Sequence, residues 1–356
     1  MNACGVDCLL LSVGSDLPWC IGYEAMATER ATVLVLPRDE RPTLVIPLLE
    51  AARVSPSPGL FVVRPWGEVE DPVRIVAELV SGRRVLGISE RAWSSLLLRL
   101  QAQMPEARFE PASKVIGPLR RRKDASEMTA LLRAAQAAQR ATEDILCGRV
   151  PLIGRRERDI ARDVSDLLLS YGHSRVNLPL VASGFNSASP HHASGGRVVG
   201  VREAVLFDFG GTWAPDGGFG YASDTSRTIC TGAPSAEFQR VYSLVKAAQE
   251  AAFEVARAGV ACSAVDGAAR SVIERAGYGA AFIHRTGHGI GLDTHEDPYI
   301  VADNGTLLGE GDAFSVEPGI YLCGEFGVRI EDVVVLTSGG PCIGNQASRE
   351  LTIVEV

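Results

Sequence analysis

The N-terminal third of the chain alternates between short apolar runs and segments of helical spacing. The runs have the length of buried strands, and turn residues separate them. The expected strands are Leu9–Val13, Thr32–Leu36, Leu44–Pro47, Leu60–Val63 and Arg84–Ile88, and the expected helices are Pro72–Val80 and Arg91–Gln103. The polar turn PRDERP between the second and third strands predicts a hairpin. This alternation predicts an α/β domain over residues 1–118.

A basic cluster, Arg120–Lys123, ends this region and precedes a long helix. Asp124 or Ser126 can cap the helix, since alanine and leucine recur after them at helical spacing. We expect the helix to be the domain junction, with a second domain over residues 119–356. The basic cluster could form an anion site, but a run of like charges is more often solvated, which is the expectation here.

The second region combines long amphipathic helices with glycine-rich pairs of strands. The expected helices are Arg156–Ser170, Ala236–Arg257 and Ser263–Ala276. The first expected strand begins at Pro179, and Ala204–Ile229 is expected to form two strands joined by a glycine-rich turn. Two further strands are expected at Ala313–Val316 and Val328–Thr337. A Gly/Ser/Asn loop after the strand at Pro179 carries His191 and His192.

Acidic residues interrupt these strands where the apolar pattern predicts burial. They are Asp208, Asp224, Glu317 and Glu331. A buried carboxylate without a partner costs several kcal/mol, so it must be paired, protonated or bound to metal. Each one could instead point to solvent, or form a salt bridge with Arg227 or Arg329. Convergence on cations is the one explanation that accounts for the whole set.

A histidine-rich stretch, HRTGHGIGLDTHED at residues 284–297, supplies a nitrogen ligand for the same site. Its central His288 stands between Gly287 and Gly289, which let the backbone come close to its neighbours. With one imidazole and no thiolate, the set is hard and oxygen-rich, which favours Mn²⁺, Co²⁺, Fe²⁺ or Zn²⁺ over Cu⁺. Among these we expect Mn²⁺. Bridging carboxylates suit two metal ions, which promote amide hydrolysis. His191, His284 and His295 would then face the substrate or support the ligands.

Composition narrows the class of protein. The chain has 356 residues, 46% hydrophobic and 22% charged, which is typical of a globular protein of two domains. A formal charge of -8 argues against nucleic-acid binding. The sequence contains no apolar run long enough to cross a bilayer, and its N-terminus resembles a strand more than a signal peptide. The 8 cysteines are scattered without a CxxC pair, as in a cytoplasmic protein with reduced thiols.

With these residues assembled, the chain resembles the pita-bread metallopeptidase family of methionine aminopeptidase, Xaa-Pro aminopeptidase and prolidase. The matching segments are ASGFNSASPHH, LFDFGG, GYASDTSRT, HRTGHGIGLDTHE, FSVEPGIY and GVRIED, in the family's order over residues 182–332. The first domain resembles the creatinase-type N-terminal domain, with DLPWCIGY as its weaker signature. The resemblance implies an α/β N-terminal domain followed by a pita-bread (α+β) catalytic domain.

Residue roles follow from the resemblance, position by position. It implies that the metal ligands are Asp208, Asp224, His288, Glu317 and Glu331, with Asp224 and Glu331 bridging. Glu317 would also be the acid/base, and His191, His284 and His295 would surround the substrate. Arg329 matches a basic residue that Xaa-Pro-cleaving members use near the site. His192 is left without a role.

The chain departs from the family pattern between Asp208 and Asp224, where WAPDGG lengthens the connection. An antiparallel hairpin can absorb extra residues at its tip, so both ligands are kept and Asp216 is expected to be a turn residue. The insertion changes the expected shape of the pocket rim and leaves the predicted metal site as it is.

The family contains several activities. The complete ligand set argues against a metal-free C–N hydrolase or a binding protein on the same fold. An Xaa-Pro dipeptidase must bind the free carboxylate of its small peptide substrate, with Arg329, Arg285, Arg38 or Arg41 as candidate cations. An Xaa-Pro aminopeptidase, the alternative, needs an open path for the rest of the peptide. The short N-terminal region favours the dipeptidase, and the family resemblance implies a homodimer.

Overall fold

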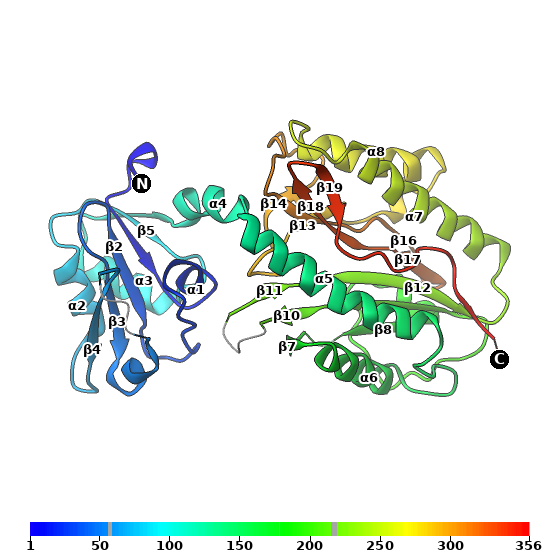
Figure 1. Ribbon diagram of the computed structural model, residues 1–356, viewed down its shortest axis with the longest axis horizontal. Helices are drawn as coiled ribbons and strands as arrows, with labels where there is room; N and C mark the ends of the chain where they lie inside the picture. Colours follow the sequence, from blue (N-terminus) through cyan, green and yellow to red (C-terminus); the bar gives the residue numbers. More distant parts are fainter. Residues whose placement is uncertain (56–58, 178, 215–218, 356) are drawn as a thin grey trace. The chain divides into compact units, whose positions relative to one another are not determined.

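The computed structural model describes residues 1–55, 59–177, 179–214 and 219–355. The chain divides into two compact units, Met1–Arg120 and Arg121–Val356 (Figure 1). Among the described residues, no helix combines the length and the apolar character that a membrane span needs. Asp216 lies outside the described residues.

The first unit is an α/β domain built on one mixed sheet with strand order β4-β3-β2-β1-β5-β6. Its strands are β1 (Cys8–Leu11), β2 (Val33–Pro37), β3 (Thr43–Pro47), β4 (Val62–Trp66), β5 (Val85–Ile88) and β6 (Arg108–Pro111). Its helices are α1 (Asp16–Ile21), α2 (Pro72–Leu79), α3 (Ser94–Gln103) and α4 (Ser113–Arg121), with 3₁₀ turns η1 (Asn2–Cys4) and η2 (Leu48–Arg53). β2 and β3 pair antiparallel, which confirms the predicted hairpin.

Helices cover both faces of this sheet, which explains why its strands are apolar throughout. Successive side chains of a strand point to opposite faces. Leu9 and Leu11 of β1 pack in one cluster with Leu17 of α1. Cys8 and Leu10 pack in another cluster with residues of α2 and α3. A central strand buried on both faces reads as a continuous apolar run, as residues 8–11 do.

The junction helix α5 (Ala125–Leu146) begins the second unit, and Asp124 caps it. The Asp124 carboxylate accepts hydrogen bonds from the backbone N–H groups of Ser126 and Glu127, and Glu127 accepts one from the Asp124 N–H. Two candidate caps were predicted, and Asp124 is the one the structure uses.

The basic cluster that precedes α5 is paired, so the prediction of a solvated charge run was wrong. Arg121 and Arg122 lie 2.6 and 3.0 Å from a carboxylate oxygen of Asp312. The Lys123 side chain is 0% exposed, and its Nζ lies 2.6 Å from Glu296 Oε1. These partners are distant in the sequence, and the charge pattern alone gives no sign of them.

The second unit contains the remaining elements. Its helices are α6 (Glu157–Ser170), α7 (Ala236–Val255) and α8 (Cys262–Arg275), with 3₁₀ turns η3 (Gly184–Ala188) and η4 (Gly279–Ala281). Its first strands are β7 (His173–Val176), β8 (Leu180–Ser183), β9 (Ala204–Phe209), β10 (Gly211–Trp213), β11 (Tyr221–Ala222), β12 (Thr225–Thr231) and β13 (Gly287–Gly289). They are followed by β14 (Glu296–Ile300), β15 (Ala313–Val316), β16 (Gly319–Leu322), β17 (Phe326–Arg329), β18 (Asp332–Thr337), β19 (Gly340–Ile343) and β20 (Ile353–Val354).

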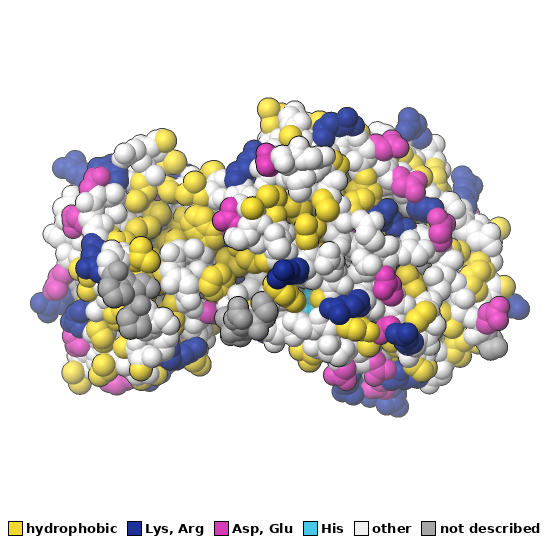
Figure 2. Space-filling model, in the orientation of Figure 1, with side chains coloured by type: hydrophobic (Ala, Val, Ile, Leu, Met, Phe, Trp, Pro, Cys, Tyr) yellow, Lys and Arg dark blue, Asp and Glu magenta, His cyan; other side chains and the backbone are white. Residues whose placement is uncertain are grey.

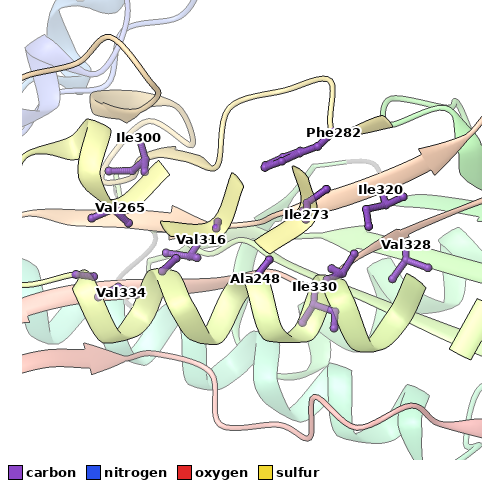
Figure 3. Packing of buried hydrophobic residues seen from close by; sticks show 14 of the residues in the cluster. Ala248, Val265, Ile273, Phe282, Ile300, Val316, Ile320, Val328, Ile330 and Val334 are labelled. Atoms are coloured by element: carbon purple, nitrogen blue, oxygen red, sulfur yellow. The ribbon is translucent and has the colours of Figure 1, made fainter. Parts of the chain in front are cut away.

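Pairs of helices cover the sheets of this unit. Residues of α5 and α6 share a core cluster with β8, β9 and β12. Residues of α7 and α8 share another with β15 to β18, as Val265, Ile273, Val316, Ile320 and Val334 illustrate (Figure 3). The sheets have orders β20-β12-β9-β8 and β14-β13-β15-β18-β19, with smaller sheets β11-β10-β7 and β16-β17. β9 pairs antiparallel with β12, and β10 pairs antiparallel with β11 in the neighbouring sheet, so the segment from β9 to β12 forms the predicted antiparallel hairpin.

The predicted strand Val328–Thr337 is in fact two strands that belong to different sheets. β17 pairs with β16, whereas β18 pairs with β15. Between them, Glu331 forms an isolated bridge with Ser226 of β12. The apolar pattern continues from β17 into β18 because both strands are buried. The sequence pattern therefore could not show that the two strands pair in different sheets.

Charged side chains of both signs are interspersed over the face of the molecule shown in Figure 2. Exposed ion pairs such as Arg74–Glu78 and Arg99–Asp71 occur in the first unit. Pairs of this kind contribute little to stability, because water screens them. The face shown in Figure 2 carries both basic and acidic side chains and is therefore not uniformly basic.

Candidate metal centre

The predicted metal ligands lie on different strands that converge. Asp208 lies in β9, Asp224 directly precedes β12, His288 is the middle residue of β13, Glu317 directly follows β15, and Glu331 lies between β17 and β18. Ser226 of β12 pairs with Asp208 on β9 and bridges Glu331 on its other side. The pairing of strands therefore brings carboxylates from distant parts of the sequence together.

The glycines beside His288 let β13 pack tightly against its neighbours. A Cβ on Gly287 would lie well inside 3.0 Å of the carbonyl oxygen of Ser315. A Cβ on Gly289 would clash in the same way with the backbone of Asp297. Real Cβ atoms essentially never come within 3.0 Å of other atoms, so glycine is required on both sides of the imidazole.

The donor atoms form overlapping groups, each within 4.8 Å, that could hold metal ions. The groups are Asp208 with Asp224 and Glu331, His288 with Glu317 and Glu331, and Asp224 with His288 and His295. Shared members join the groups into one cluster that contains every predicted ligand. His295 is an additional potential donor beyond the predicted set.

Burial makes the negative charge of this cluster unfavourable. It raises the pKa of Asp224 well above its ordinary value, and the charges of Asp208 and Glu317 raise it further. Burial likewise raises the pKa of Glu331 well above its ordinary value, and repulsion from Asp224 is the next largest cause. Burial also raises the pKa of Glu317 to about 7, against the opposing charge of Arg329. Divalent cations would neutralise these carboxylates and stabilise their ionised forms.

The imidazole of His288 is oriented as a ligand. Its Nδ1 lies 3.1 Å from the carbonyl oxygen of Gly289, so this nitrogen carries the proton and donates it. Its Nε2 faces Glu317 Oε1 at 3.3 Å and Asp224 Oδ2 at 3.7 Å. Burial lowers the pKa of His288 to about 3, so the ring is neutral at pH 7 and Nε2 presents a lone pair to the carboxylates. A cation between these donors fits this arrangement, and the donor set suits divalent metal.

Arg329 is buried beside the cluster with its donors already engaged. It is 2% exposed, and its guanidinium donates to Asp208 Oδ2 (2.7 Å), to the Tyr321 hydroxyl (2.7 Å) and to Ser226 Oγ (3.0 Å). The Ser226 hydroxyl in turn donates to Glu331 Oε2 at 2.7 Å. Arg329 therefore orients two of the predicted ligands, one directly and one through a serine.

His284 is joined to Arg329 through Tyr321. Its Nδ1 donates to the carbonyl oxygen of Arg285 at 2.7 Å, which leaves Nε2 to accept from the Tyr321 hydroxyl at 2.9 Å. Burial lowers the pKa of His284 to about 4, so this ring is neutral too. Tyr321 was missed by the sequence reasoning, although it ends the quoted segment FSVEPGIY. A tyrosine in an otherwise apolar buried strand was the available signal.

The other histidines have different environments. The ring of His295 is exposed and lies 4.0 Å, centroid to centroid, from that of His288. His191 lies in the loop after η3. The neighbouring His192, which the sequence left without a role, lies with Nε2 3.0 Å from the buried carboxylate of Glu157. His192 thus anchors the loop that carries His191.

A cavity of about 610 Å³ opens onto the cluster. It is lined by every site residue predicted from the sequence, namely His191, Asp208, Asp224, His284, His288, His295, Glu317, Arg329 and Glu331. Asn177, Phe209, Arg285 and Thr294 are among the further lining residues. The volume lies within the range of small-molecule sites, and the lining combines apolar residues such as Phe209 with the clustered polar groups.

A carboxylate-rich cluster with one buried imidazole, set in such a cavity on this fold, defines a metal-dependent hydrolase. Residues 129–338 match the model of metallopeptidase family M24, and residues 1–121 match the creatinase/prolidase N-terminal domain. The chain belongs to metallopeptidase family M24, with a creatinase-type α/β domain preceding the pita-bread catalytic domain.

The chain matches named relatives over nearly its whole length. The probable dipeptidase PepE of Mycobacterium tuberculosis is 39% identical over 355 residues, which cover 99% of this chain and 93% of that protein. The Xaa-Pro dipeptidase of Lactobacillus delbrueckii subsp. lactis is 34% identical over 366 residues, with 99% and 96% covered. The crystal structure of dipeptidase PepE from Mycobacterium ulcerans has a TM-score of 0.92 at 39% identity, with 100% and 95% covered.

Proposed function

We propose that this metallopeptidase is an Xaa-Pro dipeptidase that uses two divalent metal ions. The observation that carries the proposal is the cluster of predicted ligands that lines a cavity sized for a small peptide. The relatives named as dipeptidases cover nearly the whole chain, which supports the same substrate class. Mn²⁺ is the expected ion, with Co²⁺ or Zn²⁺ as alternatives.

The ions would be held by Asp208, Asp224, His288, Glu317 and Glu331. Ions bound there would polarise the scissile carbonyl and lower the pKa of water, which supplies the nucleophile for amide hydrolysis. Asp224, Glu331 and His288 each belong to two of the donor groups. Of these three residues, Asp224 and Glu331 have carboxylates with two oxygens, which supports bridging roles for them.

Glu317 would take the proton of the attacking water and return it to the leaving amine. Its carboxylate accepts a hydrogen bond from the Ser315 hydroxyl at 3.1 Å, which fixes one oxygen at the edge of the cavity. His191, His284 and His295 line the same cavity and would hold the substrate carbonyl or stabilise charge in the tetrahedral intermediate. Arg329 would act by orienting Asp208 and Tyr321, because its donors are engaged by the protein.

Hydrolysis of a matched pair of peptides, Ala-Pro and Ala-Pro-Ala, tests the substrate class after dialysis of the protein into Mn²⁺. The proposal predicts cleavage of the dipeptide in preference to the tripeptide. Equal or faster cleavage of the tripeptide would establish the alternative, an Xaa-Pro aminopeptidase. Failure to cleave either peptide with metal bound would overturn the peptide assignment in favour of another C–N bond. A homodimer and a cytoplasmic location stay predictions.

A further inference from the structure

A dipeptidase must distinguish a free carboxylate from a continuing peptide chain, and the proposed function therefore requires a cation within the cavity. A guanidinium is well suited to this, since its planar donors match the geometry of a carboxylate. The candidate has to line the cavity with donors that the protein itself does not use.

Arg329 does not meet that requirement. Its guanidinium is buried and already donates to Asp208, Tyr321 and Ser226, and one nitrogen lies 3.3 Å from the carbonyl oxygen of Pro190. A substrate carboxylate could bind only by displacing one of these partners. The arginines predicted from the N-terminal hairpin are engaged within their own unit. Arg38 pairs with Asp39 at 3.0 Å, and Arg41 donates to the carbonyl oxygen of Phe61 at 3.3 Å.

Arg285 meets the requirement for a cavity-lining cation with available donors. Its side chain lines the cavity and is half-buried. Within the part of the chain that the structure describes, the contact found for its guanidinium is the ring of Tyr299, with the central carbon 4.4 Å from the ring centroid. A ring face holds a guanidinium in place while leaving the N–H groups at its edge available.

The backbone around Arg285 is fixed on both sides. The carbonyl oxygen of His284 accepts a hydrogen bond from Arg270 at 2.9 Å. The N–H of Thr286 donates to the buried carboxylate of Asp266 at 3.1 Å. Because α8 carries both Arg270 and Asp266, it sets the position from which the Arg285 side chain enters the cavity. Such preorganisation reduces the entropy that substrate binding costs.

Arg285 borders the same cavity as the predicted metal ligands. The residues that line this cavity include Arg285, His295 and Glu317. A small substrate in this cavity would therefore lie among the predicted ligands and the Arg285 guanidinium.

We propose that Arg285, stacked on Tyr299, binds the C-terminal carboxylate of the substrate and thereby restricts the enzyme to dipeptides. The inference rests on the proposed dipeptidase function and adds the residue that decides the length of the substrate. Arg285 would be a specificity residue, because it contacts the substrate away from the scissile bond.

The test compares Ala-Pro with its amide, Ala-Pro-NH₂, which keeps the scissile bond and lacks the carboxylate. For Arg285→Gln we expect kcat/KM on Ala-Pro to fall about 10- to 100-fold, chiefly through KM, with kcat/KM on the amide changed by less than about threefold. Arg285→Lys should recover part of the loss, since it keeps the charge but not the planar fork.

Arg240→Gln is the matched control, because Arg240 also lies over a tyrosine ring, that of Tyr278 at 5.6 Å, but is exposed and outside the residues that line the cavity. For Arg240→Gln, the ratio of kcat/KM on Ala-Pro to kcat/KM on its amide should equal that of the wild type. If this ratio is also unchanged in Arg285→Gln while the wild type is active on Ala-Pro, the role of Arg285 alone is overturned. A wild type that is inactive on both compounds would overturn the proposed function, and the inference with it.

Discussion

Replacing Glu157 by glutamine should loosen the loop that carries His191. The Glu157 side chain is 0% exposed. One of its oxygens accepts from the backbone N–H and hydroxyl of Ser183, at 2.8 and 2.9 Å. The other accepts from the backbone N–H of Gly195 at 3.2 Å and lies 3.0 Å from His192 Nε2. A single carboxylate thus joins the start of α6 to both ends of the loop.

The size of the effect follows from these contacts. A glutamine that keeps its oxygen towards Ser183 places an NH₂ group against the N–H of Gly195 and the ring of His192. Hydrogen bonds to a charged group are worth about 1.5–3 kcal/mol each, and a buried donor left unsatisfied costs about 1–3 kcal/mol. Because a neutral amide is less costly to bury than a carboxylate, we expect a net loss of about 2–4 kcal/mol for Glu157→Gln.

Hydrogen exchange of the peptides that cover residues 183–197 measures this loss as a fall in protection. Glu143→Gln is the control, since Glu143 is an exposed carboxylate in α5 that accepts one hydrogen bond from Gln139, and its effect should stay within about 0.5 kcal/mol. Protection in Glu157→Gln that matches the wild type within about 0.5 kcal/mol would refute the reasoning.

The same carboxylate predicts a dependence on pH. Burial acts to raise the pKa of Glu157, but the hydrogen bonds from Asn186, Ser183, His192 and Gly195 prevail and hold it below the ordinary value of 4.5. A depressed pKa contributes stability that is present above 4.5 and is lost as the pH falls through the folded value. Loop protection in the wild type should therefore decrease on acidification below that pH, and the glutamine variant should lack this component.

Three further substitutions test the site. Glu317→Ala should lower kcat by about 10²–10⁴-fold while circular dichroism stays unchanged, and retained activity would exclude Glu317 as the acid/base. Gly287→Ala should destabilise the second unit by about 3 kcal/mol or more in urea unfolding, because its new Cβ would clash with the backbone of Ser315. Gly305→Ala is the control, since no atom lies within 4 Å of its new Cβ. Equal urea midpoints for the two variants would show that Gly287 is not required for packing. Tyr321→Phe should lower kcat about tenfold at unchanged metal content, since it breaks the link to His284; a change in metal content alone would assign it a structural role.

The N-terminal domain and the cluster of acidic residues could both be predicted from the sequence because each leaves a local signature. In β1, apolar residues at every position indicate a strand with both faces covered, and helices do cover both. Asp208 and Glu331 interrupt apolar stretches of the sequence. Burial of a carboxylate costs free energy unless a hydrogen bond, an ion pair or a bound metal compensates it. The structure brings both carboxylates to one cavity.

Contacts between distant residues account for what the sequence did not reveal. Lys123 is buried against Glu296, but the sequence shows it only as the last member of a basic run. The switch of sheets at Glu331 depends on a bridge to Ser226, which hydrophobicity does not encode. The anchoring of His192 by Glu157 likewise depends on a fold that brings α6 to the loop.

Titration of chelator-treated protein with Mn²⁺ shows whether hydrolysis depends on two bound metal ions, when bound metal and Ala-Pro hydrolysis are measured on the same samples. We expect activity to rise with bound metal and to saturate at about two ions per chain, as in a two-metal hydrolytic site. Asp224→Asn should lower both the metal content and the activity. Full Ala-Pro hydrolysis in the chelator-treated protein, with no metal bound, would contradict this dependence on metal.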